Sequence, residues 1–271
     1  MSTPQPQSET QNNTVENSGE FTKPNILALG NKVRLSDSEE ESGLEMYCYN
    51  QCSMTDTDFL KSCRGVIFHG DTLAFKAYPY TDEYSDKDCD QLKDILTDDY
   101  SKYQFYDAHE GCLIRVFYFN DKWYVTTHRK LDAFRSKWGS KESFGEIFKT
   151  AILHEYKKDD SKLHEKLGQV EDETVYETFL NSLNKEFSYM FLIRNTFENR
   201  IVCAASATYT VYNAGTYNSN HDFIMENDSC IPYPTKYKFS TFDQLREHVN
   251  KAGFESTAGV IIFGENNFFI E

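Results

Sequence analysis

The fold of this chain is decided by one stretch, Cys112-Leu113-Ile114-Arg115-Val116-Phe117-Tyr118-Phe119-Asn120-Asp121-Lys122-Trp123-Tyr124-Val125-Thr126-Thr127. Its two halves are rich in aromatic and β-branched residues, which favour extended strands. Asn120 and Asp121 separate the halves, and both residue types tolerate a positive backbone angle φ. The stretch therefore predicts an antiparallel hairpin with strands at 113–119 and 122–127.

Strand signals outnumber helix signals in the rest of the chain. Further strands are predicted at 44–49, 64–68, 72–78, 189–194, 201–212, 260–263 and 268–270. Apolar residues at three-to-four spacing predict helices at 143–156 and 174–183, and a capping signal at 240–243 begins a third helix that ends at Gly253. Short turns join successive strands, so the predicted fold class is α+β, an antiparallel sheet with flanking helices.

Two polar segments have little to bury. Residues 1–22 are rich in Ser, Thr, Gln, Asn and Glu and are predicted to be a disordered tail. Residues 36–42 are predicted to form an acidic loop within a single domain spanning 23–271. No window approaches the roughly 20 apolar residues of a membrane span, and the N-terminus lacks a signal peptide, so we expect no membrane partner and an intracellular protein.

The charge is strongly acidic but unevenly placed. A net charge of −15 opposes non-specific binding to nucleic acid, because phosphate contacts need Lys and Arg. The stretch 115–141 nevertheless carries seven Lys or Arg residues against two Asp residues. This local basic face suits a specific anionic ligand, although an ordinary solvated surface explains it equally well.

The cysteines do not indicate a metal site. Seven cysteines form no CxxC pair, and reduced thiols are expected in the absence of a secretory signal. Cys48 and Cys52 lie four residues apart, but no second pair of Cys or His follows at zinc-ligand spacing. We therefore predict no metal site.

Four segments resemble motifs of the bacteriophage-type RNA ligases, which are covalent nucleotidyltransferases. Residues 108–113, Ala-His-Glu-Gly-Cys-Leu, are similar to their Lys-x-Asp-Gly-x-Leu. Residues 63–68 resemble the Arg-Gly-hydrophobic strand that precedes it, 127–130 lie where the family has Thr-Arg-Gly-Ser, and 199–202 match Asn-Arg-Ile-Val. The likeness covers about 44–271 and comes closest to the RNA-ligase-like proteins of large DNA viruses. It implies an antiparallel-sheet nucleotidyltransferase domain (RNA ligase / ATP-grasp-like).

The departures from the family pattern fall on reactive groups. In the family the motif lysine attacks the α-phosphate of ATP, whereas Ala108 has no lone pair to do so. The central glutamate aligns with Leu192 or Ile193, and the later Glu-Gly motif is present as Ala258-Gly259. Residues 264–271 contain no Lys-x-Lys, and only Glu110 keeps an acidic motif side chain.

These losses favour a domain without a catalytic residue or a required cofactor, acting as a nucleotide- or RNA-binding or virion-associated interaction module. Its expected partners are a nucleotide, an RNA 5′-phosphate end or another protein, in the host cytoplasm or the virion. The candidate nucleotide- and phosphate-binding residues are Arg64, Glu110, Gly111, His128, Arg129, Lys130 and Arg200. Structural roles for Glu110, Gly111 and Arg200 remain open alternatives.

The alternative hypothesis is an active ligase or nucleotidyltransferase that uses ATP and Mg²⁺ through a relocated nucleophile. His109 can carry a nucleotidyl group, but neighbouring strand residues point to opposite faces, so it is expected to face away from the vacant position. Lys102 and Lys130 are further candidates, and solvated surface roles explain both more simply. A third hypothesis is a purely structural partner protein that has lost ligand binding.

Overall fold

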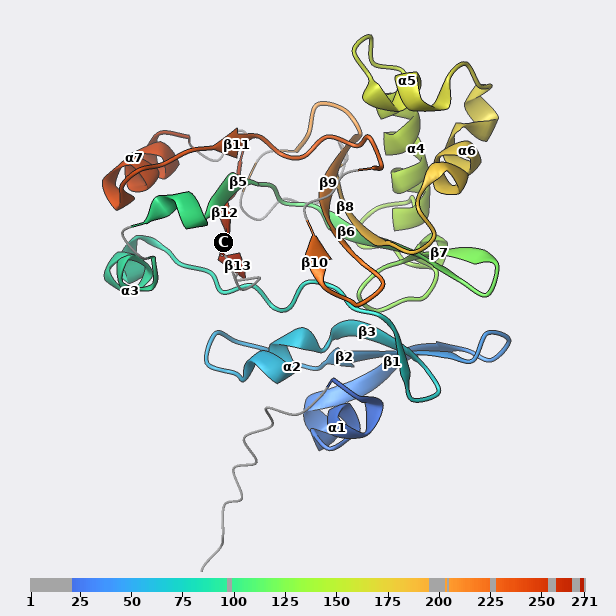
Figure 1. Ribbon diagram of the computed structural model, residues 1–271, viewed down its shortest axis with the longest axis horizontal. Coiled ribbons are helices and arrows are strands. Elements are labelled where there is room, and N and C mark those ends of the chain that lie inside the picture. Colours follow the sequence, from blue (N-terminus) through green and yellow to red (C-terminus); the bar gives the residue numbers. More distant parts are fainter. Residues whose placement is uncertain are drawn as a thin grey trace, which may run out of the picture.

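In the computed structural model, the residues that the structure describes form three antiparallel sheets (Figure 1). The structure describes residues 21–96, 99–194, 203, 205–224, 228–252, 257–264 and 269–270. The first sheet has the order β1-β2-β3-β4: Val33–Glu39, Leu44–Tyr49, Arg64–His69 and Thr72–Phe75. The second has the order β10-β9-β8-β6-β7: Phe223–Ile224, Thr210–Tyr217, Ser188–Arg194, Cys112–Phe119 and Lys122–Thr126. The third has the order β11-β5-β12-β13: Lys236–Tyr237, Gln104–Ala108, Gly259–Phe263 and Phe269–Ile270.

The helices lie around the outside of the sheets (Figure 1). Their bounds are α1 Lys23–Leu27, α2 Asp58–Ser62, α3 Cys89–Ile95, α4 Phe144–Tyr156, α5 Lys162–Leu167, α6 Val175–Ser182 and α7 Phe242–Ala252. None of the described helices combines the length and apolar character needed to span a lipid bilayer. The predicted α+β class with an antiparallel sheet is confirmed.

The hairpin that decides the fold forms as predicted. β6 pairs with β7 in the register Arg115↔Thr126 to Phe119↔Lys122, and the turn residues Asn120 and Asp121 have φ of 46° and 61°. β8 pairs with the other edge of β6, so β6 is an interior strand of the second sheet. Its central residues are consequently buried on both faces.

Helix α4 covers one face of the second sheet. Ser143 caps its N-terminus and exchanges hydrogen bonds with Glu146 in a capping box, which satisfies the first backbone N–H groups. The apolar side of α4 packs into the largest core cluster, where the Phe148 ring stacks on Phe191 of β8 with centroids 5.4 Å apart. The predicted helices at 143–156 and 174–183 are thus present as α4 and α6.

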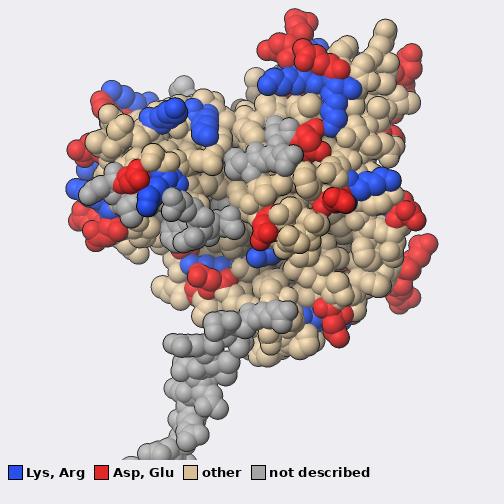
Figure 2. Space-filling model, in the orientation of Figure 1, with Lys and Arg blue, Asp and Glu red and all other residues tan. Residues whose placement is uncertain are grey.

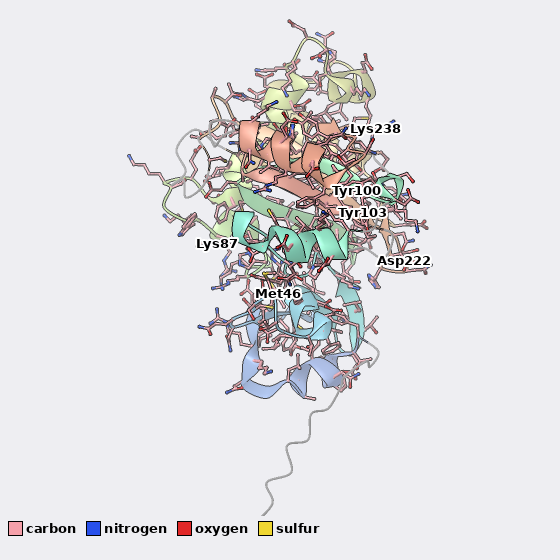
Figure 3. All side chains as sticks on the ribbon, turned by 90° about the vertical axis from the view of Figure 1, so that its left-hand side faces the viewer. Met46, Lys87, Tyr100, Tyr103, Asp222 and Lys238 are labelled. Atoms are coloured by element: carbon pink, nitrogen blue, oxygen red, sulfur yellow. The ribbon has the colours of Figure 1, made fainter. Side chains whose placement is uncertain are left out.

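The other face of the second sheet packs on the first sheet. Phe75 of β4 stacks on Phe117 of β6 with ring centroids 5.2 Å apart, and both rings are fully or almost fully buried. Met46 of β2 belongs to the same core cluster and lies on the side of the first sheet that faces the rest of the protein (Figure 3). Segments of both sheets therefore meet along a buried seam.

The prediction of an acidic loop at 36–42 is wrong for residues 36–39, because these residues form the end of β1. Only the turn after Glu39 lacks strand structure. Asp37 is accommodated because its carboxylate accepts a hydrogen bond from the backbone N–H of Leu131 at 2.9 Å and lies 3.4 Å from Lys130 Nζ. These partners are distant in sequence, so local composition gave no sign of them.

The predicted tail and both ends of one predicted strand also need correction. Residues 1–20 lie outside the described part, but Phe21 packs on Phe59 and Thr22 caps α1, so the tail does not extend to 22. The strand predicted at 201–212 begins only at Thr210 and continues to Tyr217, and the described residues 205–209 are not strand. That segment is mostly small residues, which contribute little to cross-strand packing. Gly253, predicted as a helix end, lies outside the described residues.

Candidate functional site

A cavity of about 710 Å³ opens where the three sheets meet. The first sheet contributes Arg64, the segment after β7 contributes Thr127 to Arg129, and the β5–β6 connection contributes Ala108 to Leu113. Residues Ser136 to Trp138 lie along another part of the wall, and Ile261 and Phe263 of β12 complete the apolar side. Segments far apart in sequence therefore form one concave site, as small-ligand sites commonly do.

Ala108 lines this cavity at the end of β5. The residue is 3% exposed, and its carbonyl oxygen accepts hydrogen bonds from Ala258 N and from Thr257 Oγ1, both at 2.7 Å. Gly259 is its partner in the β5–β12 ladder. The backbone at 108 is therefore firmly held, and the methyl side chain of this lining residue offers no electron pair.

His109 lines the same cavity, contrary to the expectation that it would face away from the Ala108 position. Strand β5 ends at Ala108, so strand alternation does not extend to the next residue. The imidazole stacks on Tyr212 with centroids 4.8 Å apart, and its Nδ1 lies 3.3 Å from Nη1 of the buried Arg194. A guanidinium group only donates, so Nδ1 accepts and the proton lies on Nε2. The Nδ1 lone pair is thus engaged by Arg194, which disfavours His109 as a nucleophile.

Glu110 and Gly111 line the cavity and also have structural roles. Glu110 Oε2 accepts a hydrogen bond from the backbone N–H of Cys203 at 3.2 Å. A Cβ built on Gly111 would lie 2.4 Å from the carbonyl oxygen of Ile193, so glycine is required for this approach to β8. Leu192 of β8 lines the wall, so one of the two positions aligned with the family's glutamate presents an apolar side chain there.

Basic side chains gather on one wall. Arg64, Arg115, His128 and Arg129 all line the cavity. His128 is exposed in the cavity. The surrounding protein nevertheless desolvates its imidazole, and this desolvation is the main reason that its pKa is lowered to about 3. The nearby positive charges of Arg115, Arg64 and Arg129 act in the same direction. Its imidazole is therefore neutral at physiological pH, and the arginines carry the positive charge of this wall.

Of the remaining candidates, Lys130 and Lys102 are not part of the lining. Lys130 pairs with Asp37, and Lys102 ends a short 3₁₀ helix at 100–102. Arg200 lies outside the described residues. The structure thus brings Arg64, Ala108, His109, Glu110, Gly111, His128 and Arg129 together around one cavity.

Lys137 and Trp138 belong to the wall but were not predicted as site residues. Trp138 is 55% exposed and presents an aromatic surface at the site. The clustering of basic residues in 115–141 was the available signal for Lys137. Nothing in the local sequence distinguishes an exposed Trp from a buried one.

The lining does not fit a metal bound by a carboxylate cluster. Among the residues that the structure describes, no three His, Cys, Asp or Glu side chains converge in a way that could hold a metal ion. The lining carboxylates are Asp107, which accepts from the Tyr237 hydroxyl at 3.2 Å, and Glu110, which accepts from Cys203. The alanine at position 108 offers no amine to which AMP could be transferred.

Sequence comparisons relate the chain to viral proteins. No protein-family model matches the chain. The chain is 35% identical over 211 residues to the immediate-early protein ICP-46 homolog of Invertebrate iridescent virus 6, a match covering 73% of this chain and 43% of that protein. The corresponding homolog of Invertebrate iridescent virus 3 is 32% identical over 219 residues, covering 77% of this chain and 39% of that protein. The chain thus spans about two fifths of the length of these viral relatives.

Among solved structures, the fold is similar to a protein assigned as an ATP-dependent DNA ligase from Aquifex aeolicus. The TM-score is 0.53 at 14% identity, and the match covers 91% of this chain and 60% of that one. At this identity the likeness shows the fold alone. The protein therefore has a ligase-like nucleotidyltransferase fold, which confirms the fold implied by the sequence resemblance.

Proposed function

We propose that the cavity binds the phosphate group of a nucleotide or of an RNA 5′ end, and that it does so without covalent catalysis. The observation that carries this proposal is the composition of one wall. Arg64 and Arg129 line the cavity that contains Ala108 in place of a nucleophile. Guanidinium groups suit phosphate oxygens because their planar N–H forks form charge-assisted hydrogen bonds.

The size and the mixed lining of the cavity support a ligand larger than a free anion. A volume of about 710 Å³ lies within the range of small-molecule sites. Tyr106, Tyr233 and Trp138 line it together with the basic groups, so aromatic surface is available for a base. Acidic and basic side chains are mixed over α5–α6 and around α3 and α7 on the face shown in Figure 2. Phosphate would therefore be recognised by the arginines of the cavity rather than by a broad positive surface.

The viral proteins that the chain resembles support a role in a viral setting. We infer a role in the host cytoplasm or in the virion for a domain that spans 23–271, and the sequence resemblance and these viral proteins support it. A protein partner that docks on this domain is part of the same proposal.

Calorimetry with matched ligands tests the binding. The protein is titrated with ATP, with a 5′-phosphorylated RNA and with the same RNA bearing a 5′-hydroxyl. We expect binding of a phosphorylated ligand, at least tenfold weaker binding by Arg129→Ala, and unchanged binding by Lys251→Ala, which removes an exposed cation on α7. Equal affinity for the two RNAs, together with no binding of ATP, contradicts a phosphate site.

Intact mass spectrometry after incubation with ATP and Mg²⁺ tests the absence of covalent catalysis. We expect no increase corresponding to one AMP. One observation favours the alternative of a relocated nucleophile, because Lys137 lines the same cavity. That alternative predicts an AMP adduct that disappears in Lys137→Met, together with joining of 5′-phosphorylated RNA ends.

A further inference from the structure

Arg115 is a fully buried cation at the wall of the cavity. It lies in the interior strand β6 and is 0% exposed. Its Nη1 donates to the carbonyl oxygens of Arg64 at 2.8 Å and Gly65 at 2.9 Å, and its Nη2 donates to the carbonyl oxygen of Thr127. The guanidinium carbon lies 5.3 Å from the centre of the Phe75 ring.

These hydrogen bonds join the two segments that carry the cavity's other arginines. Arg64 and Gly65 begin β3 of the first sheet, whereas Thr127 directly follows β7 of the second sheet. The next residues after Thr127 are His128 and Arg129. One guanidinium group therefore sets the position of Arg64 relative to the 127–129 segment, because a planar fork fixes the direction of each bond.

The positive charge of Arg115 has no carboxylate partner among the residues that the structure describes. Its acceptors are carbonyl oxygens and, at 3.9 Å, the sulfur of Met46, and its Nε has no partner there. Lys61, which is buried less completely, differs because its Nζ lies 2.8 Å from Asp82 Oδ1. Burial lowers the pKa of Arg115 to about 9, so the group is still protonated at neutral pH. A buried cation without an anion is costly, and Arg64 and Arg129 add to the unbalanced charge.

We propose that Arg115 is a positioning residue for a phosphate site, and that a phosphate group bound in the cavity supplies the missing negative charge while Arg115 holds Arg64 and the 127–129 segment around it. The proposal rests on the proposed function and goes further in two respects. Arg115 acts on the ligand through its neighbours, and ligand binding stabilises the seam between the first and second sheets. A purely structural clamp accounts for the three carbonyl bonds, but it leaves the unbalanced charge without a role.

Two variants and one control separate these roles. Arg115→Lys keeps the charge but loses the planar fork, and Arg115→Met removes the charge. Lys61→Met removes a buried cation that is paired elsewhere. Each protein is checked by circular dichroism and titrated with ATP, inorganic pyrophosphate and adenosine, while the thermal midpoint is recorded with and without each ligand.

We expect the wild-type midpoint to rise with ATP and pyrophosphate but not with adenosine. Arg115→Lys is expected to bind ATP at least tenfold more weakly with its fold retained, whereas Lys61→Met melts earlier but binds ATP as the wild type does. Wild-type affinity in Arg115→Lys overturns the role of Arg115 and leaves the proposed function standing. Equal shifts with adenosine and ATP also overturn it, and no binding of ATP or pyrophosphate by the wild type overturns both proposals.

Hydrogen exchange of the wild-type protein tests the proposal even if both Arg115 variants unfold. Pyrophosphate is expected to slow amide exchange in 64–66 and 126–129, on the two sides of the seam, with no change in α5 and α6. Unchanged exchange at the seam under saturating pyrophosphate contradicts the proposed coupling.

Discussion

Gly65 approaches His128 so closely that a Cβ built on Gly65 would lie 2.5 Å from the His128 carbonyl oxygen. Gly65 also has a φ of +72°, in the left-handed region that side chains disfavour. Two independent constraints therefore require glycine at the point where the first sheet meets the segment after β7. This contact brings Arg64 next to the basic wall of the cavity.

Gly65→Ala is expected to destabilise the protein by more than the roughly 1–2 kcal/mol cost of a left-handed alanine, because the backbone of His128 must also move. Gly70→Ala is the matched control, since Gly70 has a φ of +57° with no atom within 4 Å of its Cβ position. Urea unfolding measures both free energies. We also expect only Gly65→Ala to weaken ATP binding, and equal losses of stability in the two variants contradict the close approach.

Replacing His128 is expected to change how stability depends on pH. The folded-state pKa of His128 is lowered to about 3, from a usual value of 6.5, so between these values the unfolded chain binds the proton more readily than the folded one. Its contribution to stability is therefore present above about pH 6.5 and is lost as the pH falls towards 3. Urea unfolding from pH 7 to pH 4 is expected to show a shallower decline in His128→Asn than in the wild type. Parallel curves contradict the lowered pKa.

Restoring a lysine at the aligned position is not expected to restore chemistry. Ala108→Lys supplies an amine, but Leu192 presents an apolar side chain at a position aligned with the family's glutamate, so we expect the amine to lack the carboxylate that the family's chemistry uses. Intact mass after incubation with ATP and Mg²⁺ is expected to be unchanged. Ala108→Met controls for added bulk, and an AMP adduct specific to Ala108→Lys would show that the site lost only its nucleophile.

Trp138 is expected to contribute to RNA binding through stacking. Trp138 is 55% exposed and lines the cavity, and one stacked base is typically worth about 1–3 kcal/mol. Trp138→Ala should therefore weaken binding of a 5′-phosphorylated RNA roughly 5- to 150-fold, with little change in thermal stability, whereas Trp138→Phe retains most of the affinity. Undiminished RNA binding by Trp138→Ala in a fluorescence titration excludes stacking there.

Local pattern predicted the elements whose partners are near in sequence. The β6–β7 hairpin and α4 carry their own turn and capping signals, so both were predictable. The Asp37 segment was predicted wrongly because its carboxylate is satisfied by Leu131, 94 residues away. Tertiary partners of this kind override local composition.

The same distinction applies to the candidate site. Arg64, His128 and Arg129 were predicted from motif resemblance, and the structure places them around one cavity. The expected direction of His109 was wrong because β5 ends at Ala108, so the alternation of side chains along a strand does not apply to His109. Arg115 and Trp138 could not be predicted, because a buried cation on a strand and an exposed ring in a loop are properties of the assembled fold.

The pairing of β5 with β12 also constrains the order in which the protein can assemble during synthesis. The hydrogen bond from Thr257 to the carbonyl of Ala108 spans 149 residues. At translation rates of about 5–20 residues per second, the ribosome needs roughly 7 to 30 seconds to make the intervening chain. The β6–β7 hairpin can form early in that interval, but the strand carrying Ala108 must wait for its late-arriving neighbour.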